Sequence, residues 1–325
     1  MNPENSPAKP SLLIAFGGNA LQTPESSNRQ RDEFFAARRS MRAVAELIQN
    51  GYEKIVLTHG NGPQVGRIFL QQELTKNEFP RQVTLDVCVA DSQGRIGYIL
   101  QNVFDSVCAE LGVNRKCYAV ITQAVVDPAD PAFQNPGKPI GVFYSAEDAE
   151  RLARERGWVL REDAGRGHRR VVPSPKPLEI VEKKIFQTLL DQGFIAIGAG
   201  GGGIPVFRDA TGGFSHGVEA VIDKDRASAL LANEIGIDCF VMLTAVDFAC
   251  LDFNSPRQTP IHTATAEEME TYMELGHFLE GSMKPKVESA IQFVRNGGKR
   301  AIIAHLNDLL LALEGKTGTQ ILPDK

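Results

Sequence analysis

Three lysines have neighbours that are unusual for a solvated surface side chain. Lys138 stands between a glycine and a proline, Lys224 between two aspartates, and Lys286 directly after a proline. Most lysines in any chain are simply exposed to water, because lysine is rarely buried without a partner. Neighbours that restrict the backbone or supply a counter-charge favour cations in fixed positions. Phosphoryl transfer to an anionic acceptor needs such cations, since its catalysis is mainly positioning and charge neutralisation. No serine-histidine-aspartate set or pair of catalytic carboxylates competes with them.

Glycine clusters are the second feature with chemical meaning. They occupy residues 17–18, 60–62 and 200–203, and each follows a short apolar run that is typical of a buried strand. Glycine lets backbone N–H groups approach an anion closely, and a following helix N-terminus adds positive dipole. Ligands of an open parallel sheet bind beyond the carboxyl ends of its strands. One cluster is equally well explained as a tight turn, but three at strand ends predict an anion-binding edge.

Two other glycine motifs lack the context that their chemistry requires. Residues 198–203 match GxGxxG, but a dinucleotide fingerprint must open a helix, and here Ile204 and Pro205 lead into a turn at 209–213. Residues 315–317 resemble the end of a Walker A loop, but Leu310 stands where its first glycine belongs. The sequence therefore supports neither a nicotinamide cofactor nor a P-loop.

Composition narrows the class of protein. The chain has 325 residues and a net charge of −5, which disfavours non-specific binding to nucleic acid. No apolar run approaches the roughly 20 residues of a membrane helix, and residues 1–10 read as a disordered tail without signal-peptide features. Five unpaired cysteines and six scattered histidines predict neither disulfides nor a structural metal site. We expect a soluble cytoplasmic protein.

Alternating strands and helices must position these residues. Apolar runs predict strands at 12–16, 54–58, 116–122, 194–197, 239–243 and 300–304. Helical spacing predicts helices at 34–50, 96–111, 178–192, 225–235, 286–295 and 307–313. This order indicates βαβ units with helices on both faces of a parallel sheet. Residues 127–177 interrupt it with proline, glycine and charge, and a loop this long is improbable in a compact domain. They predict an inserted subdomain that projects over the sheet edge and moves as a unit.

With these motifs in order, the sequence resembles the carbamate kinases of the amino-acid kinase family. The resemblance runs from about residue 12 to residue 321. It rests on AFGGNAL (15–21), THGNGPQVG (58–66), SQGRIGY (92–98), ITQAVVDPADPAF (121–133), KPIGVFY (138–144), EDAGRGHRRVVPSPKP (162–177), GGGGIPV (200–206), GVEAVIDKD (217–225), GSMKPKVESA (281–290) and GKTGT (315–319). Ten long motifs are far more specific than any single pattern.

The resemblance implies a fold and an activity. The fold is an open three-layer αβα sandwich with a mainly parallel central sheet and a small projecting subdomain, in one domain over 11–325. It divides into an acceptor and dimer lobe (11–205), carrying the lid at 127–177, and a nucleotide lobe (206–325). The implied reaction is ATP plus carbamate to ADP plus carbamoyl phosphate, with Mg²⁺ carried by the nucleotide. A homodimer that works toward ATP in arginine catabolism is also implied.

The resemblance also assigns roles to residues. The assigned phosphate-binding residues are Gly17, Gly18 and Asn19, and the carbamate-binding residues are Gly60, Asn61 and Gly62. The assigned catalytic residues are Lys138, Lys224, Lys286 and Asp225, and the nucleotide contacts are Thr244, Asp247, Gly281, Ser282 and Met283. Related amino-acid kinases carry a lysine where this chain has Ala15, and Lys138 on the insert is expected to replace its charge.

A few positions depart from the family pattern. Ala245 replaces an aspartate, and Asp91 and Arg95 replace methionines around the Ser-Gln-Gly motif. An aspartate at 245 could bind nucleotide, so alanine predicts modestly weaker binding. It could equally be a turn or cap residue, as aspartate often is. Two other functions stay open: a kinase of another small carboxylate such as an amino acid, which the Ala15 and Lys138 exchange disfavours, and a weakly active nucleotide-binding paralogue with a regulatory role.

Overall fold

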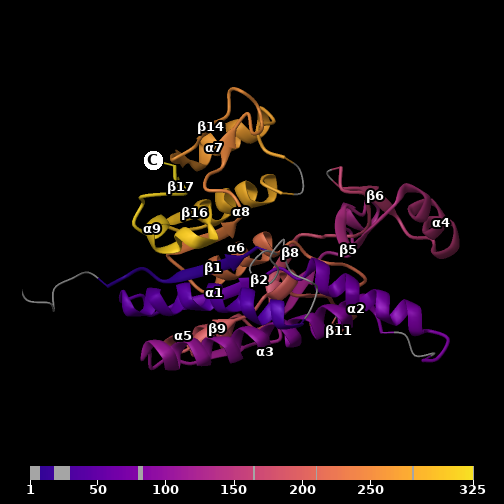
Figure 1. Ribbon diagram of the computed structural model, residues 1–325, viewed down its shortest axis with the longest axis horizontal. Helices are drawn as coiled ribbons and strands as arrows, with labels where there is room; N and C mark the ends of the chain where they lie inside the picture. Colours follow the sequence, from indigo (N-terminus) through magenta and orange to yellow (C-terminus); the bar gives the residue numbers. More distant parts are fainter. Residues whose placement is uncertain are drawn as a thin grey trace, which may run out of the picture.

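An eight-stranded sheet runs through the centre of the protein (Figure 1). The structure is a computed structural model that describes residues 8–17, 30–79, 83–163, 165–209, 211–279 and 282–324. From edge to edge the strands are β15 (Thr263–Thr265), β17 (Thr319–Leu322), β16 (Arg300–His305), β12 (Cys239–Thr244), β1 (Leu12–Phe16), β2 (Ile55–His59), β9 (Ile195–Ile197) and β3 (Cys117–Ala119). Every neighbouring pair is parallel except β16 with β17. The predicted mainly parallel sheet is thus confirmed.

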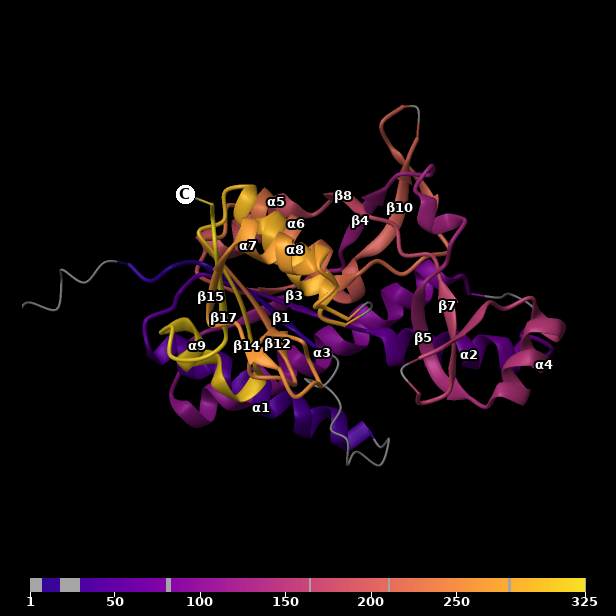
Figure 2. The same cartoon turned by 90° about the horizontal axis from the view of Figure 1, so that it is seen from above.

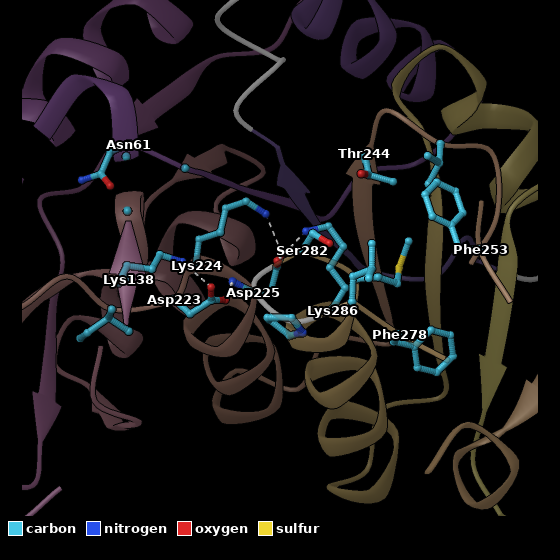
Figure 3. Close-up of a pocket in the computed structure, with 18 of the residues that line it drawn as sticks. Asn61, Lys138, Asp223, Lys224, Asp225, Thr244, Phe253, Phe278, Ser282 and Lys286 are labelled. Carbon is cyan, nitrogen blue, oxygen red and sulfur yellow. Dashed lines mark hydrogen bonds and ion pairs between the residues drawn. The ribbon is translucent and has the colours of Figure 1, made fainter. Parts of the chain in front are cut away.

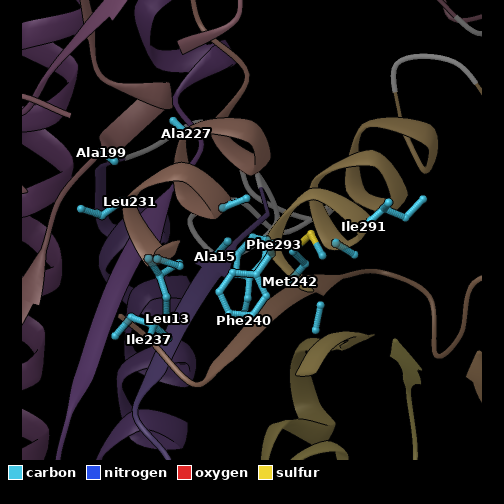
Figure 4. Packing of buried hydrophobic residues seen from close by; sticks show 14 of the residues in the cluster. Leu13, Ala15, Ala199, Ala227, Leu231, Ile237, Phe240, Met242, Ile291 and Phe293 are labelled. Carbon is cyan, nitrogen blue, oxygen red and sulfur yellow. The ribbon is translucent and has the colours of Figure 1, made fainter. Parts of the chain in front are cut away.

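Helices cover both faces of this sheet. On β1, Leu13 and Ala15 join one buried cluster, whereas Leu12, Ile14 and Phe16 join the other, because successive strand side chains point to opposite faces. The first cluster, partly drawn in Figure 4, also takes side chains from α5 (Lys183–Asp191), α6 (Lys224–Glu234), α7 (Ala266–Glu274) and α8 (Lys284–Arg295). The second takes side chains from α1 (Gln30–Gln49), α3 (Leu85–Leu111) and α9 (Leu309–Leu313). The αβα sandwich is confirmed. Among the described residues, no helix combines the length and the apolar character that crossing a bilayer requires.

Part of the predicted insert folds as a separate small unit that projects from the main sheet (Figure 2). It contains a three-stranded sheet in the order β5 (Lys138–Tyr144), β7 (His168–Val172) and β6 (Leu160–Glu162), with α4 (Ala146–Arg156) beside it. Of the predicted lid at 127–177, residues 138–172 form this projecting unit, and from here on the lid means residues 138–172. The chain enters through β4 (Gln123–Val126) and the 3₁₀ turn η3 (Pro131–Phe133), and leaves through β8 (Pro177–Ile180). Because β4 pairs antiparallel with β8, the two ends of the insert are held together.

Short elements complete the structure. A four-stranded sheet in the order β11-β10-β4-β8 adds β10 (Ile204–Arg208) and β11 (Phe214–Gly217) to the two strands that flank the insert. A two-stranded ribbon joins β13 (Cys250–Leu251) to β14 (Thr259–Pro260). Two further 3₁₀ turns are η4 (Gly200–Gly202) and η5 (Leu306–Asp308). Since a strand follows η4, the GxGxxG match does not open a helix, as predicted.

Several elements differ from the prediction: helix α7 and the edge strands β15 and β17 were not predicted, and three further differences have a local cause. Helix α2 (Gly62–Thr75) begins inside the glycine-proline segment that was interpreted only as a turn; proline is well tolerated in a first helical turn, where no intrahelical bond is lost. Helix α3 begins at Leu85 rather than at residue 96, because its early residues already bury one face. Residues 178–180 form β8 and not helix, since Ile180 pairs with Ala124 of β4.

Candidate active site

A cavity of about 360 Å³ opens where strands β2 and β12 end and helices α2, α6 and α8 begin (Figure 3). Three helix N-termini at one cavity favour a bound anion, because their N–H groups and dipoles point toward it. The lining residues are Gly60, Asn61, Gly62, Lys138, Gly201, Ile222, Asp223, Lys224, Asp225, Thr244, Val246, Cys250, Phe253, His277, Phe278, Leu279, Ser282, Met283, Pro285 and Lys286. All four predicted catalytic residues are among them.

Lys224 and Lys286 share one carboxylate. Lys224 Nζ lies 2.6 Å from Asp225 Oδ1, and Lys286 Nζ lies 2.9 Å from Asp225 Oδ2. Lys224 and Asp225 come from the first turn of α6, whereas Lys286 comes from the first turn of α8. Each Asp225 oxygen therefore fixes one ammonium group, and two helices that are distant in sequence present their charges side by side. The predicted role of Asp225 in organising the lysines agrees with this geometry.

Lys138 reaches the cavity from the lid. Its Nζ lies 2.5 Å from Asp223 Oδ2, while Asp223 Oδ1 accepts hydrogen bonds from the backbone N–H of Asp225 at 2.9 Å and of Arg226 at 3.4 Å. Asp223 is thus the N-cap of α6 and the counter-ion of Lys138 at once. From the sequence, Asp223 was predicted only to be a charged neighbour of Lys224. Its signal was an aspartate directly before a predicted helix, which is a typical N-cap.

The electrostatics leave one positive charge for a ligand, since three lysines face two aspartates. Burial alone would raise the pKa of Asp223 and of Asp225, but the nearby lysines lower both below the usual carboxyl range. Burial lowers the pKa of Lys224, against the attraction of Asp225. Burial would also lower the pKa of Lys286, but Asp225 and Asp223 together raise it. Both carboxylates are therefore charged at neutral pH, and the charge of Lys224 is the more sensitive of these two buried ammonium groups.

The glycine turn after β2 makes room for a lysine and supports an amide. A Cβ on Gly60 would lie 3.3 Å from Lys224 Cδ, so glycine leaves space for the lysine side chain. The buried Asn61 donates from Nδ2 to Ser92 Oγ at 2.8 Å, and Ser92 Oγ donates to the Val89 carbonyl at 2.6 Å. Asn61 is thereby held rigidly at the cavity wall. Helix α3 supplies this support, and it is continuous through Asp91 and Arg95 despite the departures there.

The four-glycine turn packs against the first one. A Cβ on Gly201 would overlap the Asn61 amide, and one on Gly202 would lie 2.6 Å from the Ile222 carbonyl oxygen. Gln93 fixes the turn, donating from Nε2 to the Gly200 carbonyl at 2.9 Å. Of this predicted anion-binding cluster, Gly201 lines the cavity, and the described contacts show mainly close packing.

His59 lies buried beneath both turns. Burial lowers the pKa of its imidazole to about 4, so the ring is neutral at physiological pH. Its Nδ1 lies 3.1 Å from the Gly60 carbonyl oxygen, and a Cβ on Gly200 would lie 2.5 Å from the ring. His59 therefore acts as packing between the turns and adds no positive charge to the site.

The far end of the cavity is apolar. Figure 3 shows Thr244, Phe253 and Phe278 on the side away from Lys138. Val246, Cys250 and Met283 add to this wall. Thr244, Ser282 and Met283 line this cavity, and their contacts with a nucleotide stay a prediction. The two phenylalanines were missed because they occur in irregular segments without periodicity.

Other predicted residues lie elsewhere. Gly17 does not line the cavity; its N–H donates to the Leu243 carbonyl at 3.2 Å, and a Cβ there would lie 2.9 Å from the same oxygen. Asp247 is exposed, away from the cavity lining, and its carboxylate lies within 4.8 Å of ligand atoms of His305 and Asp308. Gly18, Asn19 and Gly281 lie outside the described residues. The roles predicted for these five stay predictions.

Comparison with known proteins identifies the family of the chain. The amino acid kinase family model matches residues 11–305. Carbamate kinase from Pyrococcus horikoshii is 47% identical over 314 residues, covering 96% of this chain and 99% of that protein. Carbamate kinase from Giardia lamblia, solved with citric acid, is 41% identical with a TM-score of 0.91 over 98% of this chain and 99% of that chain. The structure of the same Giardia protein with AMP-PNP has a TM-score of 0.88 and covers 98% of this chain and 99% of that chain. The chain belongs to the amino acid kinase family, and within that family it groups with the carbamate kinases.

Proposed function

We propose that this chain transfers a phosphoryl group reversibly between ATP and carbamate, giving ADP and carbamoyl phosphate. The observation that carries the proposal is the convergence of Lys138, Lys224 and Lys286 at one end of a cavity whose other end is apolar. Such a cavity suits a nucleotide, with its base at the apolar end and its phosphates at the lysines. The Giardia relative was solved with the ATP analogue AMP-PNP, which supports nucleotide binding by this chain.

The residues act by position and charge. In the proposed reaction the bond from the γ-phosphorus to the ADP oxygen breaks as the bond to the carbamate oxygen forms. Lys224 and Lys286 neutralise charge on the transferring group, and Asp225 keeps both ammonium groups in place. The carbamate binds at the N-terminus of α2, at Gly60, Asn61 and Gly62. Lys138 supplies the positive charge at this end of the cavity. None of these residues forms a covalent intermediate.

Magnesium fits this site only as a companion of the nucleotide. The two carboxylates that line the cavity, Asp223 and Asp225, are each engaged with lysine ammonium groups. Mg²⁺ usually keeps several waters and binds substrate phosphates with one or two carboxylates. When bound, the ion neutralises phosphate charge. We propose that the nucleotide phosphates and water would hold it, and that Asp223 and Asp225 are the carboxylates of the cavity lining that could assist.

Coupled ATP formation from ADP and carbamoyl phosphate tests the activity. We expect turnover with carbamoyl phosphate and at least about tenfold less with acetyl phosphate, an acyl phosphate that lacks the amino group. Greater turnover with acetyl phosphate would indicate a kinase of another carboxylate. Nucleotide binding in a parallel titration without turnover would indicate a weakly active paralogue. Either result would contradict the proposal.

We also propose that the lid moves over the acceptor site. It contacts α2 through Gly66 and Gly141, and it carries Lys138 to Asp223. Closure would exclude water from a labile acyl phosphate. Hydrogen exchange with and without AMP-PNP and carbamate tests this: amides of the whole insert, residues 127–177, should become more protected. Unchanged protection over the whole segment would contradict the motion.

We also propose a location, an assembly and a direction of reaction for this protein. The family resemblance supports a cytoplasmic homodimer that works mainly toward ATP in arginine catabolism. Light scattering of the purified protein measures the assembly, and a mass of one chain of 35.5 kDa would contradict the dimer.

A further inference from the structure

A second cavity, of about 570 Å³, lies between the lid and helix α2. Its walls come from α2, from the segment that follows α4, and from β7. Phe69, Arg156, Trp158 and Arg170 are among its lining residues, and none of them lines the lysine cavity. No residue assigned to the proposed reaction lies here, so the architecture of this cavity needs a separate explanation.

Two arginines line this cavity with unused donors. The guanidinium groups of Arg156 and Arg170 both line the cavity, but their Nη1 atoms are buried, have no hydrogen-bond partner among the described residues and do not face the cavity. The Arg170 guanidinium lies 4.2 Å from the Phe69 ring centroid and 4.7 Å from that of Trp158, and Arg156 lies 5.0 Å from Trp158. Ring contacts use the faces of a guanidinium and leave its edge donors free. The other guanidinium nitrogens of the two arginines also make no hydrogen bond to a described residue, and these are the donors that an acceptor in the cavity can reach.

The acidic residues of the same wall do not fill this role. Glu219 accepts a hydrogen bond from the Leu85 N–H at 2.8 Å, and Glu155 lies 3.3 Å from Arg151. Glu73 lies 3.7 Å from Arg156, too far for a hydrogen bond. Burial lowers the pKa of Arg170, and the charges of Glu219 and Glu73 do not fully offset this. No carboxylate of the described residues lies within ion-pair distance of Arg170, so its charge lacks a direct counter-ion.

We propose that this cavity binds a small oxyanion, a phosphate or a carboxylate, through the guanidinium edges of Arg156 and Arg170. A planar guanidinium matches the oxygen spacing of both groups and can donate two parallel hydrogen bonds. The cavity is roomy enough for the anion with bound water, and its aromatic wall holds the arginines in place. The proposal does not depend on which acid the enzyme phosphorylates.

The site is coupled to the lysine cavity through one pair of strands. Val172 of β7 lines the second cavity and pairs with Lys138 of β5, which lines the first. Arg170 pairs with Ile140 of β5 in the same ladder. An anion that restrains Arg170 would therefore restrain the strand that carries Lys138, and so bias the position of the lid.

Trp158 is the chain's single tryptophan and reports on this cavity directly. Its fluorescence is followed while inorganic phosphate or succinate is added at constant ionic strength, with AMP-PNP saturating the lysine cavity. We expect a saturable change with at least one anion. A response to phosphate alone assigns a phosphate ligand, and a response to succinate alone assigns a carboxylate. No saturable response to either would overturn the proposal.

Variants separate a binding role of Arg170 from a packing role. Arg170→Met keeps a long side chain but should weaken the anion by about tenfold or more, since a charge-assisted bond is lost. Arg170→Lys keeps the charge but loses the planar guanidinium edge, so its affinity for the anion should lie between those of wild type and Arg170→Met. It also provides the test if Arg170→Met fails to fold. Arg161→Met, which changes an exposed arginine of the same lid that does not line the cavity, should leave the midpoint unchanged. Equal midpoints in wild type and Arg170→Lys and Arg170→Met would overturn the assignment. Equilibrium dialysis of phosphate gives the same midpoints without relying on the tryptophan.

Discussion

The three lysines of the site are held in two different ways. Lys224 and Lys286 come from helices packed on the main sheet, share Asp225, and expose only 11% and 13% of their side chains. Lys138 comes from the lid, exposes 28%, and meets the body of the protein through Asp223. The first two are fixed before any substrate arrives, whereas the position of the third depends on how the lid docks.

The difference separates two contributions to one reaction. Cations fixed in a buried cluster stabilise a developing charge without reorganisation, which is where large catalytic effects arise. A cation on a mobile element adds selectivity and excludes water when it closes. We therefore expect changes in the Asp225 cluster to affect kcat most, and changes at the contact between lid and body to affect folding and closure as well.

Lys224→Ala should produce the largest effect. Losing one fixed cation at the transferring group should lower kcat about a hundredfold, or roughly 3 kcal/mol. Stability should fall less, because Asp225 keeps its pair with Lys286. Turnover and urea unfolding are measured on the same preparation, with the exposed Lys184→Ala as the matched control. A variant with near wild-type turnover would exclude the catalytic role of Lys224.

Gly66→Ala tests the contact between lid and body. A Cβ on this α2 residue would overlap the Gly141 backbone of β5, so the lid must shift. Overpacking of this kind costs about 1–3 kcal/mol. We expect unfolding free energy to fall by about 2 kcal/mol and kcat/KM to fall with it, since Lys138 moves with β5.

Gly94→Ala is the matched control for that change. It is also a helical glycine, but its added Cβ would meet nothing within 4 Å. It should stabilise the protein by about 0.5–1 kcal/mol, as alanine does in a helix interior. If both alanine variants behave alike, the Gly66 contact has no special role in docking the lid.

Asp223→Asn should change the pH dependence of stability. The folded-state pKa of Asp223 is lowered by Lys138, so its stabilisation is fully present above the unfolded carboxyl range and is lost progressively as pH falls from there toward the folded-state pKa. Between about pH 4.5 and 3 the Asp223 carboxyl should lower the unfolding free energy of the wild type by up to about 1.4 kcal/mol per pH unit. The asparagine variant has no carboxyl here, so its unfolding free energy should fall less steeply over the same range.

Urea unfolding at several pH values measures both slopes. Asp191→Asn, an exposed aspartate, should keep the wild-type slope. The asparagine variant should also be less stable at neutral pH, because Lys138 loses its partner. Parallel curves for wild type and Asp223→Asn would show that the pair with Lys138 contributes nothing to folding.

The sequence predicts more of the lysine cluster than of the cavity around it. Lys224 and Asp225 are adjacent in the chain, so their shared position could be predicted from local context. Asp223 could have been assigned as an N-cap by the same reasoning. Phe253 and Phe278 could not, because they enter the cavity from irregular segments whose path is set by tertiary packing. Helix α2 was missed since its first residues are glycine and proline, which favour turns when considered alone.

Ala245→Asp should have the smallest effect and distinguishes the two interpretations of this position. If the family's aspartate bound nucleotide, restoring it would lower the KM for ADP several-fold, since a net hydrogen bond is worth about 1 kcal/mol. Thr244 and Val246 line the cavity, but Ala245 is exposed and does not. We therefore expect KM and kcat within about twofold of wild type, as for a turn residue. Thr244→Val is the positive control, and it should raise the KM for ADP by a few-fold through loss of a hydroxyl in the cavity. A several-fold fall in KM for Ala245→Asp would place residue 245 at the nucleotide. A large rise in kcat from a nearly inactive parent would instead favour a weakened paralogue over the proposed kinase.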